Sequence, residues 1–104
     1  MHQAFRPGSR LQFHHTDNPH VLCYSRESAD GRDRIMVVLS LDPKLMQHGW
    51  VDVPVDAWDL PRDYAVLDEL SGETFRWTGP RNYVRLEPGV SPGHILVFPP
   101  GEGA

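Results

Sequence analysis

The sequence has little of several things, and each shortage excludes a class of protein. Its 104 residues are too few for a (β/α)-barrel, which needs about 250. Cys23 is the only cysteine, so neither an internal disulfide framework nor a thiolate metal cluster is expected, and we interpret this residue as a small buried hydrophobe. No apolar run reaches the roughly 18 residues of a membrane span, and the first residues lack the apolar core of a signal peptide. We therefore expect one cytoplasmic domain that does not bind a membrane.

Basic residues are also few and scattered. Ten Lys and Arg stand against fourteen Asp and Glu, which gives a net charge of −4. Nucleic-acid-binding domains need a concentrated positive surface to neutralise phosphates, and no basic stripe is present. We expect no nucleic-acid partner.

What the sequence does contain is a series of short runs in which apolar and polar residues alternate. The alternation is typical of strands with one buried face. Turn-forming residues separate the runs at intervals of about ten residues, which is typical of an antiparallel sandwich or barrel. The runs lie at 20–26, 34–41, 49–55, 64–70, 73–78, 81–88 and 93–98. The sequence predicts an all-β fold, an antiparallel β-sandwich of about seven strands over residues 11–98, with a flexible leader over 1–10 and a disordered tail over 99–104.

Three local patterns predict connections between these strands. Residues 73–88 read as a β-hairpin whose turn contains Gly79 and Pro80, because glycine accepts tight-turn angles and proline cannot donate a ladder hydrogen bond. Ser71 and Gly72 predict a two-residue turn with a positive φ at the glycine. Residues 56–60 form the one segment that favours a helical turn.

The densest cluster of polar side chains lies before the first predicted strand. His14, His15, Asp17 and His20 have the composition of a zinc or copper site. Adjacent side chains on an extended chain point in opposite directions, however, and the spacing matches no standard metal motif. We favour a hydrogen-bonded turn in which Asp17 and Asn18 accept bonds from backbone donors, and we predict no metal and no cofactor.

No pattern in the sequence predicts catalysis. There is no Gly-x-Ser-x-Gly nucleophile motif, and the carboxylates read as solvated side chains or turn-forming groups; Asp68, at the start of a turn, is expected to bind backbone amides. Trp50, Trp58 and Tyr83 are the candidate contacts for a carbohydrate or a protein interface, because exposed aromatic rings stack on sugars and are enriched at interfaces. Packing in the core is the competing interpretation for the same rings.

Several motifs, taken in order, resemble the C-terminal β-domain of the bacterial α-1,4-glucan:maltose-1-phosphate maltosyltransferases of the α-amylase superfamily. They lie at residues 13–18, 37–43, 47–51, 68–72 and 77–88. The most specific is Trp77-x-Gly-x-x-Asn-Tyr-Val-Arg-Leu86, and the resemblance covers residues 11–98. It implies a cytosolic enzyme that extends α-glucans with retention, using an aspartate nucleophile and a glutamate acid/base on a (β/α)-barrel. This sequence has no matching position for either catalytic residue.

The resemblance leads us to expect a non-catalytic accessory sandwich that supports a catalytic barrel, encoded in the same or a neighbouring chain. The alternative is a freestanding module that binds a carbohydrate such as α-glucan, or another protein. A small metal-dependent enzyme built on the histidine cluster is the third hypothesis.

Overall fold

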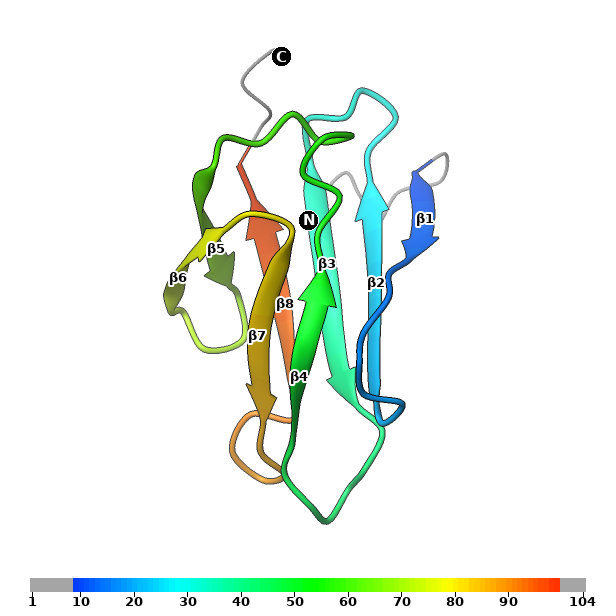
Figure 1. Ribbon diagram of the computed structural model, residues 1–104, viewed down its shortest axis with the longest axis vertical. Coiled ribbons are helices and arrows are strands. Elements are labelled where there is room, and N and C mark those ends of the chain that lie inside the picture. The colour runs from blue at the N-terminus through cyan, green and yellow to red at the C-terminus, as the bar shows by residue number, and fades with distance from the viewer. Residues whose placement is uncertain (1–8, 100–104) are drawn as a thin grey trace.

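The structure is a computed structural model that describes residues 9–99 and consists of two antiparallel β-sheets packed face to face (Figure 1). The larger sheet has six strands in the order β1-β2-β3-β8-β5-β6, and the smaller sheet pairs β4 with β7. The strands are β1 (Arg10–Phe13), β2 (Val21–Glu27), β3 (Arg34–Ser40), β4 (Gln47–Asp52), β5 (Asp63–Asp68), β6 (Thr74–Thr78), β7 (Arg81–Leu86) and β8 (Gly93–Phe98). No segment between residues 9 and 99 forms a helix that could span a membrane.

The predicted all-β antiparallel sandwich is confirmed, with eight strands where about seven were expected. The additional strand is β1, four exposed residues that pair with the edge of β2. Arg10, which the sequence placed in the leader, is the first residue of β1. The rest of the predicted leader, residues 1–8, and residues 100–104 of the predicted tail lie outside the described residues.

Strand β3 is central, as its composition predicts. It lies between β2 and β8, and its first five residues are buried, so side chains on both of its faces are covered. A strand buried on both faces cannot alternate with polar residues, which explains why this run is the most continuously apolar in the sequence. Met36 and Val38 face the smaller sheet, while Ile35 and Val37 belong to a second cluster on the opposite face.

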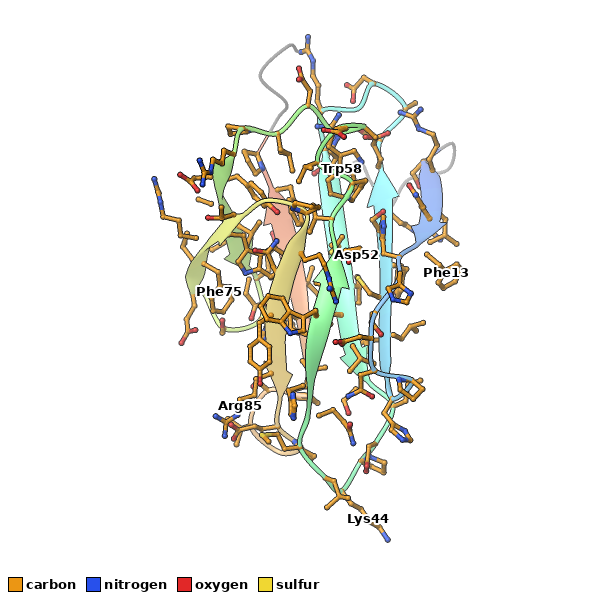
Figure 2. All side chains as sticks on the ribbon, viewed as in Figure 1. Phe13, Lys44, Asp52, Trp58, Phe75 and Arg85 are labelled. Carbon is orange, nitrogen blue, oxygen red and sulfur yellow. The ribbon has the colours of Figure 1, made fainter. Side chains whose placement is uncertain are left out.

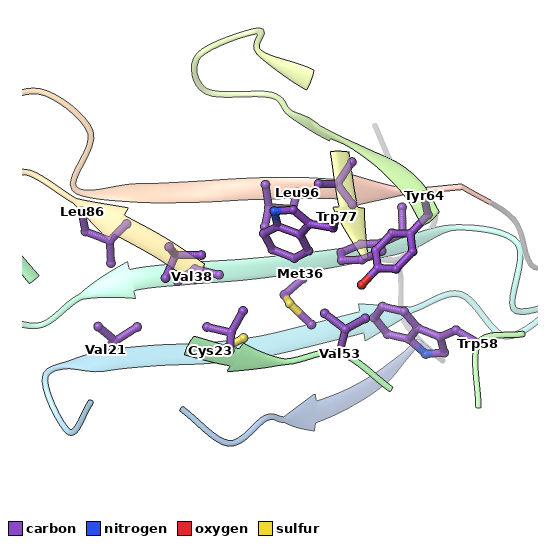
Figure 3. Close-up of a cluster of buried hydrophobic side chains, with 14 residues drawn as sticks. Val21, Cys23, Met36, Val38, Val53, Trp58, Tyr64, Trp77, Leu86 and Leu96 are labelled. Carbon is purple, nitrogen blue, oxygen red and sulfur yellow. The ribbon is translucent and has the colours of Figure 1, made fainter. Parts of the chain in front are cut away.

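The core fills the space between the two sheets (Figure 3). Valines from the smaller sheet lie against the large sheet, and aromatic rings gather at one end of the layer. Three rings, those of Trp58, Trp77 and Tyr64, surround Phe98 with centroid separations of 5.1 to 6.0 Å. Cys23 lies in this core, as expected, and burial together with the nearby charge of Asp52 raises the pKa of its thiol to about 12. The thiol is therefore protonated and packs as a hydrophobe.

The predicted hairpin over residues 73–88 is wrong in its pairing. Both strands and the turn exist, but β6 pairs with β5 in the large sheet and β7 pairs with β4 in the small one. The segment is a corner that carries the chain from one sheet to the other. Alternation specifies which side chains face the core, and Trp77 and Val84 both do so, but it does not specify the strand that lies alongside.

Asn82, a buried side chain, holds this corner. Its Oδ1 accepts a hydrogen bond from the Thr78 N–H at 3.1 Å, and its Nδ2 donates to the Tyr64 hydroxyl at 3.0 Å and to the Gly79 carbonyl at 3.1 Å. The Tyr64 hydroxyl donates to the same carbonyl at 2.7 Å. The amide thus occupies the place of a partner strand where β6 ends, and Gly79, with φ of +66°, makes the reversal.

The predicted helical turn over residues 56–60 is instead a series of hydrogen-bonded turns. The Trp58 N–H donates to the Pro54 carbonyl and the Leu60 N–H to the Val55 carbonyl, but Asp59 adopts a left-handed φ of +52°, which no α-helix continues. Arg34 of β3 holds this loop against the large sheet. Its guanidinium donates to the Trp58 carbonyl at 2.9 Å and to Glu27 at 2.6 Å.

The connection between β5 and β6 is longer than the predicted two-residue turn. The Asp68 N–H donates to the Glu73 carbonyl, so residues 69–72 form a four-residue loop. The predicted positive φ of Gly72 is confirmed at +78°, and a Cβ built there would meet no atom within 4 Å. Any cost of a side chain at this position comes from backbone strain alone.

We expect Gly72→Val to lower the free energy of unfolding by about 1 kcal/mol or more, because a β-branched residue is strained at positive φ. Gly72→Asn is the matched control and should lose less, since asparagine tolerates this region. Thermal unfolding followed by circular dichroism measures both. An unchanged midpoint for the valine variant would contradict this account of the loop.

Candidate functional site

Two of the three predicted aromatic contacts meet on the outer face of the small sheet. Trp50 of β4 lies directly opposite Tyr83 of β7, with ring centroids 5.7 Å apart and planes inclined at 67°. Both rings are nearly half exposed. His48 packs beside Tyr83 at 5.8 Å, and the Arg81 guanidinium lies 5.9 Å from the Trp50 ring. We call these four residues the aromatic surface.

The third predicted contact, Trp58, is absent from this surface. It is 4 % exposed and lies in the core between Phe98 and the Arg34 guanidinium. Figure 2 shows it toward one end of the sandwich, beyond Asp52 at the end of β4. Residues 53–60 turn inward after β4 ends, which carries this indole to the end of the sandwich. Its burial makes it a packing residue in the isolated domain.

The histidine cluster lies along the edge of β4 that does not pair with β7. We call residues 14–18 the strap. The Asp17 N–H donates to the Trp50 carbonyl at 3.3 Å, and the Asp52 N–H donates to the His15 carbonyl at 3.1 Å. Asp17 Oδ1 accepts the Trp50 N–H, and Asn18 Oδ1 accepts the His20 N–H, both at 2.8 Å. The predicted hydrogen-bonded turn is confirmed, and it has a partner strand that the sequence did not reveal.

The imidazoles do not converge. His14 Nε2 lies 2.6 Å from the Ser25 hydroxyl, and its ring packs on Trp58, so burial lowers the pKa of His14 although Asp52 opposes the shift. His15 and His20 are exposed. Within residues 9–99 no three histidine, cysteine or carboxylate side chains are grouped as metal ligands would be. Nothing in the geometry supports the metal-enzyme hypothesis.

Gly49 explains how closely the strap approaches β4. A Cβ at this position would lie 2.7 Å from Asp17 Oδ1 and 3.2 Å from Asn18 Cβ. The first distance is shorter than a Cβ contact allows, so a side chain at residue 49 would displace the Asp17 carboxylate from the Trp50 N–H that it accepts.

A groove of about 330 Å³ opens along β7, at the edge of the small sheet opposite the strap, and is bounded by β6, β7 and β8. The small sheet has only two strands, so part of the inner face of the large sheet is left uncovered there. Phe75, Trp77, Val84 and Leu96 form its apolar lining, and Glu73, Tyr83, Arg85, Glu87, Ser91 and His94 complete it. Sequence reasoning missed this site. The inward alternation of Phe75 with Trp77 was visible, but nothing in the sequence showed that β7 would leave Phe75 partly uncovered.

His94, which lines this groove, pairs with the buried carboxylate of Asp68 behind it. His94 Nδ1 lies 2.8 Å from Asp68 Oδ2, which also accepts the Ser71 hydroxyl, while Oδ1 accepts the N–H groups of Leu70 and Ile95. Burial raises the pKa of Asp68, but the hydrogen bonds from His94, Ser71 and the two backbone amides outweigh it and leave the pKa below its ordinary value. The carboxylate is ionised and accepts only, so Nδ1 of His94 carries the proton. The predicted backbone-binding role of Asp68 is confirmed.

Comparison with known proteins gives one consistent result. Residues 13–98 match the family model described as "GLGE, C-terminal". The chain is 43 % identical over 96 residues to alpha-1,4-glucan:maltose-1-phosphate maltosyltransferase 1 of Streptomyces coelicolor and 42 % identical over 97 residues to isoform 2, covering 90 % and 91 % of this chain. It is 38 % identical over 97 residues to the protein of that name from Picrophilus torridus, again over 91 % of this chain. The matches span only 14 to 15 % of the relatives' own length.

We expect Asp68→Asn to lower the free energy of unfolding at pH 7 by about 2 kcal/mol. Each carboxylate oxygen of Asp68 accepts two hydrogen bonds, so the amide nitrogen that replaces one of them presents donors to two donors. Since the folded pKa of Asp68 is depressed, its stabilising contribution is complete above the unfolded value of about 4 and is lost as pH falls below it. The difference in free energy of unfolding between the unsubstituted chain and the Asp68→Asn variant should therefore decrease at acid pH.

Urea unfolding between pH 3 and pH 7 measures this difference. Asp63→Asn is the control, because the Asp63 carboxylate is exposed and, among residues 9–99, accepts a hydrogen bond only from the Thr78 hydroxyl. A pH-independent difference for Asp68→Asn would contradict the charge assigned to this residue.

Proposed function

Because the chain belongs to the family of domains described as "GLGE, C-terminal", we propose that it is the accessory β-sandwich domain of an α-1,4-glucan:maltose-1-phosphate maltosyltransferase. The observation that carries the proposal is the extent of the match: nearly all of this chain corresponds to about one seventh of each relative. In this proposal maltosyl transfer belongs to the remaining part of such an enzyme, and this domain supports a catalytic (β/α)-barrel. We also propose a cytoplasmic location, which suits a single buried cysteine that forms no disulfide.

The outer face of the six-stranded sheet is the surface we propose for the barrel. Phe13, Leu39 and Leu67 are 65, 36 and 41 % exposed on it, around the buried pair Ile35 and Val37. The outward side of an antiparallel sheet in a lone sandwich is ordinarily polar. A large exposed apolar face marks an interaction site, and packing between domains of one enzyme is its simplest use.

Two assays test the accessory role. The isolated chain, incubated with maltose 1-phosphate and glycogen, should release no phosphate. A chimera in which this chain replaces the matching C-terminal segment of maltosyltransferase 1 of Streptomyces coelicolor should be folded and active, while the enzyme truncated before that segment should not be. Turnover by the isolated chain, or a chimera no better folded than the truncated enzyme, would overturn the proposal.

The proposed barrel contact is tested within the same chimera. Leu39→Lys should reduce the fraction of chimera recovered as folded enzyme, because it places a charge in an apolar interface. Val90→Lys is the matched control, since Val90 is 78 % exposed in the loop after β7 and lies outside the proposed interface. Both variants should leave the isolated chain folded. Equal recovery of the two chimeras would move the barrel contact to another face.

A second candidate function, weak binding of α-glucan, is favoured by the aromatic surface. The 67° between the Trp50 and Tyr83 rings makes an angled surface, which suits a curved α-1,4-linked chain better than a flat β-1,4-linked one. The Arg81 guanidinium and His48 supply hydrogen-bond donors beside the rings.

Titration of the ¹⁵N-labelled chain with maltoheptaose should shift the Trp50 indole N–H and the Tyr83 amide, and cellohexaose should shift them less. Trp50→Ala should abolish the response. Tyr24→Ala, a partly buried aromatic on the opposite face of the molecule, is the control. Unmoved resonances at Trp50 and Tyr83 would leave the accessory role without a glucan contact.

A further inference from the structure

The two edges of the small sheet differ. On the β4 side, the strap of residues 14–18 takes up the outward backbone groups, as the bonds to the Trp50 carbonyl and from the Asp52 N–H show. In an antiparallel pair the backbone groups of successive residues point to alternate sides. The N–H and C=O groups of Gly49 and Val51 therefore point toward β7. The backbone groups of their partners, Val84 and Asn82, point toward β4.

On the β7 side, the same alternation turns the N–H and C=O groups of Tyr83 and Arg85 away from β4 and toward the groove. The next residue in this series, Glu87, supports the assignment, since its N–H donates to the Ser91 carbonyl at 3.0 Å. Among residues 9–99, no backbone group bonds those of Tyr83 and Arg85 on this side. They form a short free strand edge.

The opposite wall of the groove has a free edge too. The backbone groups of Phe75 and Trp77 point to β5, because the neighbouring Glu73 and Gly79 bond Asp68 and Arg62 there. Those of Thr74 and Arg76 therefore point outward. The Thr78 N–H belongs to the same outward series, and the Asn82 side chain occupies it. From this corner the two edges diverge, with the groove between them.

The residues that line the groove indicate which kind of ligand it could bind. The Phe75 ring meets the His94 ring edge to face at 5.8 Å, and Leu96 is fully buried beside them. The Arg85 guanidinium is already paired with Glu87 at 3.0 Å. The Glu73 carboxylate makes no ion pair with any residue between 9 and 99. The groove thus combines an apolar floor, unpaired strand backbone and one uncompensated negative charge.

We propose that this groove binds an extended peptide segment of a separate partner protein, which adds to β7 as a third strand. Its backbone pairs with Tyr83 and Arg85, alternate apolar side chains enter beside Val84 over Phe75, and a lysine or arginine lies near Glu73. A volume of about 330 Å³, at the low end for ligand sites, accepts a few side chains of one strand and not the body of a second folded copy. The proposal is independent of the accessory role.

Selection of random seven-residue peptides displayed on phage against the full 104-residue chain supplies the probe. Synthetic versions of the enriched peptides are then titrated into the ¹⁵N-labelled chain. We expect alternating apolar residues with a basic residue, and shift changes centred on the amides of Tyr83, Arg85 and Phe75. Methylation of the peptide amides that face β7 should abolish binding, while methylation of the intervening amides should preserve it.

A pair of charge variants tests whether the basic residue of the peptide lies near Glu73. Glu73→Lys should weaken binding about tenfold through like-charge repulsion, and Asp56→Lys, an exposed acidic residue in the loop after β4, should change it less than about twofold. Selected peptides that leave Tyr83 and Arg85 unmoved would overturn the proposal, as would equal binding by both methylated series. Shifts at the Phe75 and Arg85 amides, which lie outside the aromatic surface, caused by maltoheptaose alone or by dimerisation of the chain alone would assign the groove to another occupant.

Discussion

The small sheet owes its position to the side chain of Asn82. A buried amide can satisfy three hydrogen bonds at a place where the backbone has no partner strand, and here it bonds Thr78, Tyr64 and Gly79 at the same time. The chain can therefore leave one sheet and enter the other within four residues. The two strands that meet at this corner remain unpaired with each other, which produces both the groove and the outward display of Trp50 and Tyr83.

Local features of this fold could be predicted from the sequence, and pairing could not. The alternation around Trp77 and Val84 correctly assigned both side chains to the core, since alternation depends only on the geometry of one strand. Which strand lies beside which depends on residues distant in the chain. For that reason a corner held by Asn82 was interpreted as a hairpin, and β1, with four exposed residues and no buried side chain, gave no signal.

In the candidate sites, too, residue types could be predicted from the sequence, whereas their positions relative to one another could not. Trp50 and Tyr83 were predicted from their residue type, and their meeting on one face follows from a cross-strand register that no single run encodes. Trp58 was predicted alongside them, but a left-handed residue at Asp59 and the guanidinium of Arg34 hold it in the core. The histidine cluster was correctly interpreted as a turn, and its role as a covering for β4 became visible only with Gly49 beneath it.

That covering sets a limit on polymerisation. If the open edge of β7 in one molecule paired with its equivalent in another, the joined sheet would end on both sides in a strap already bonded to β4. Growth through the small sheet would stop at two molecules, whereas a sheet with two open edges could continue into a fibre. The close approach of Asp17 and Asn18 to Gly49 thus leaves this half of the sandwich without the second open edge that a filament needs.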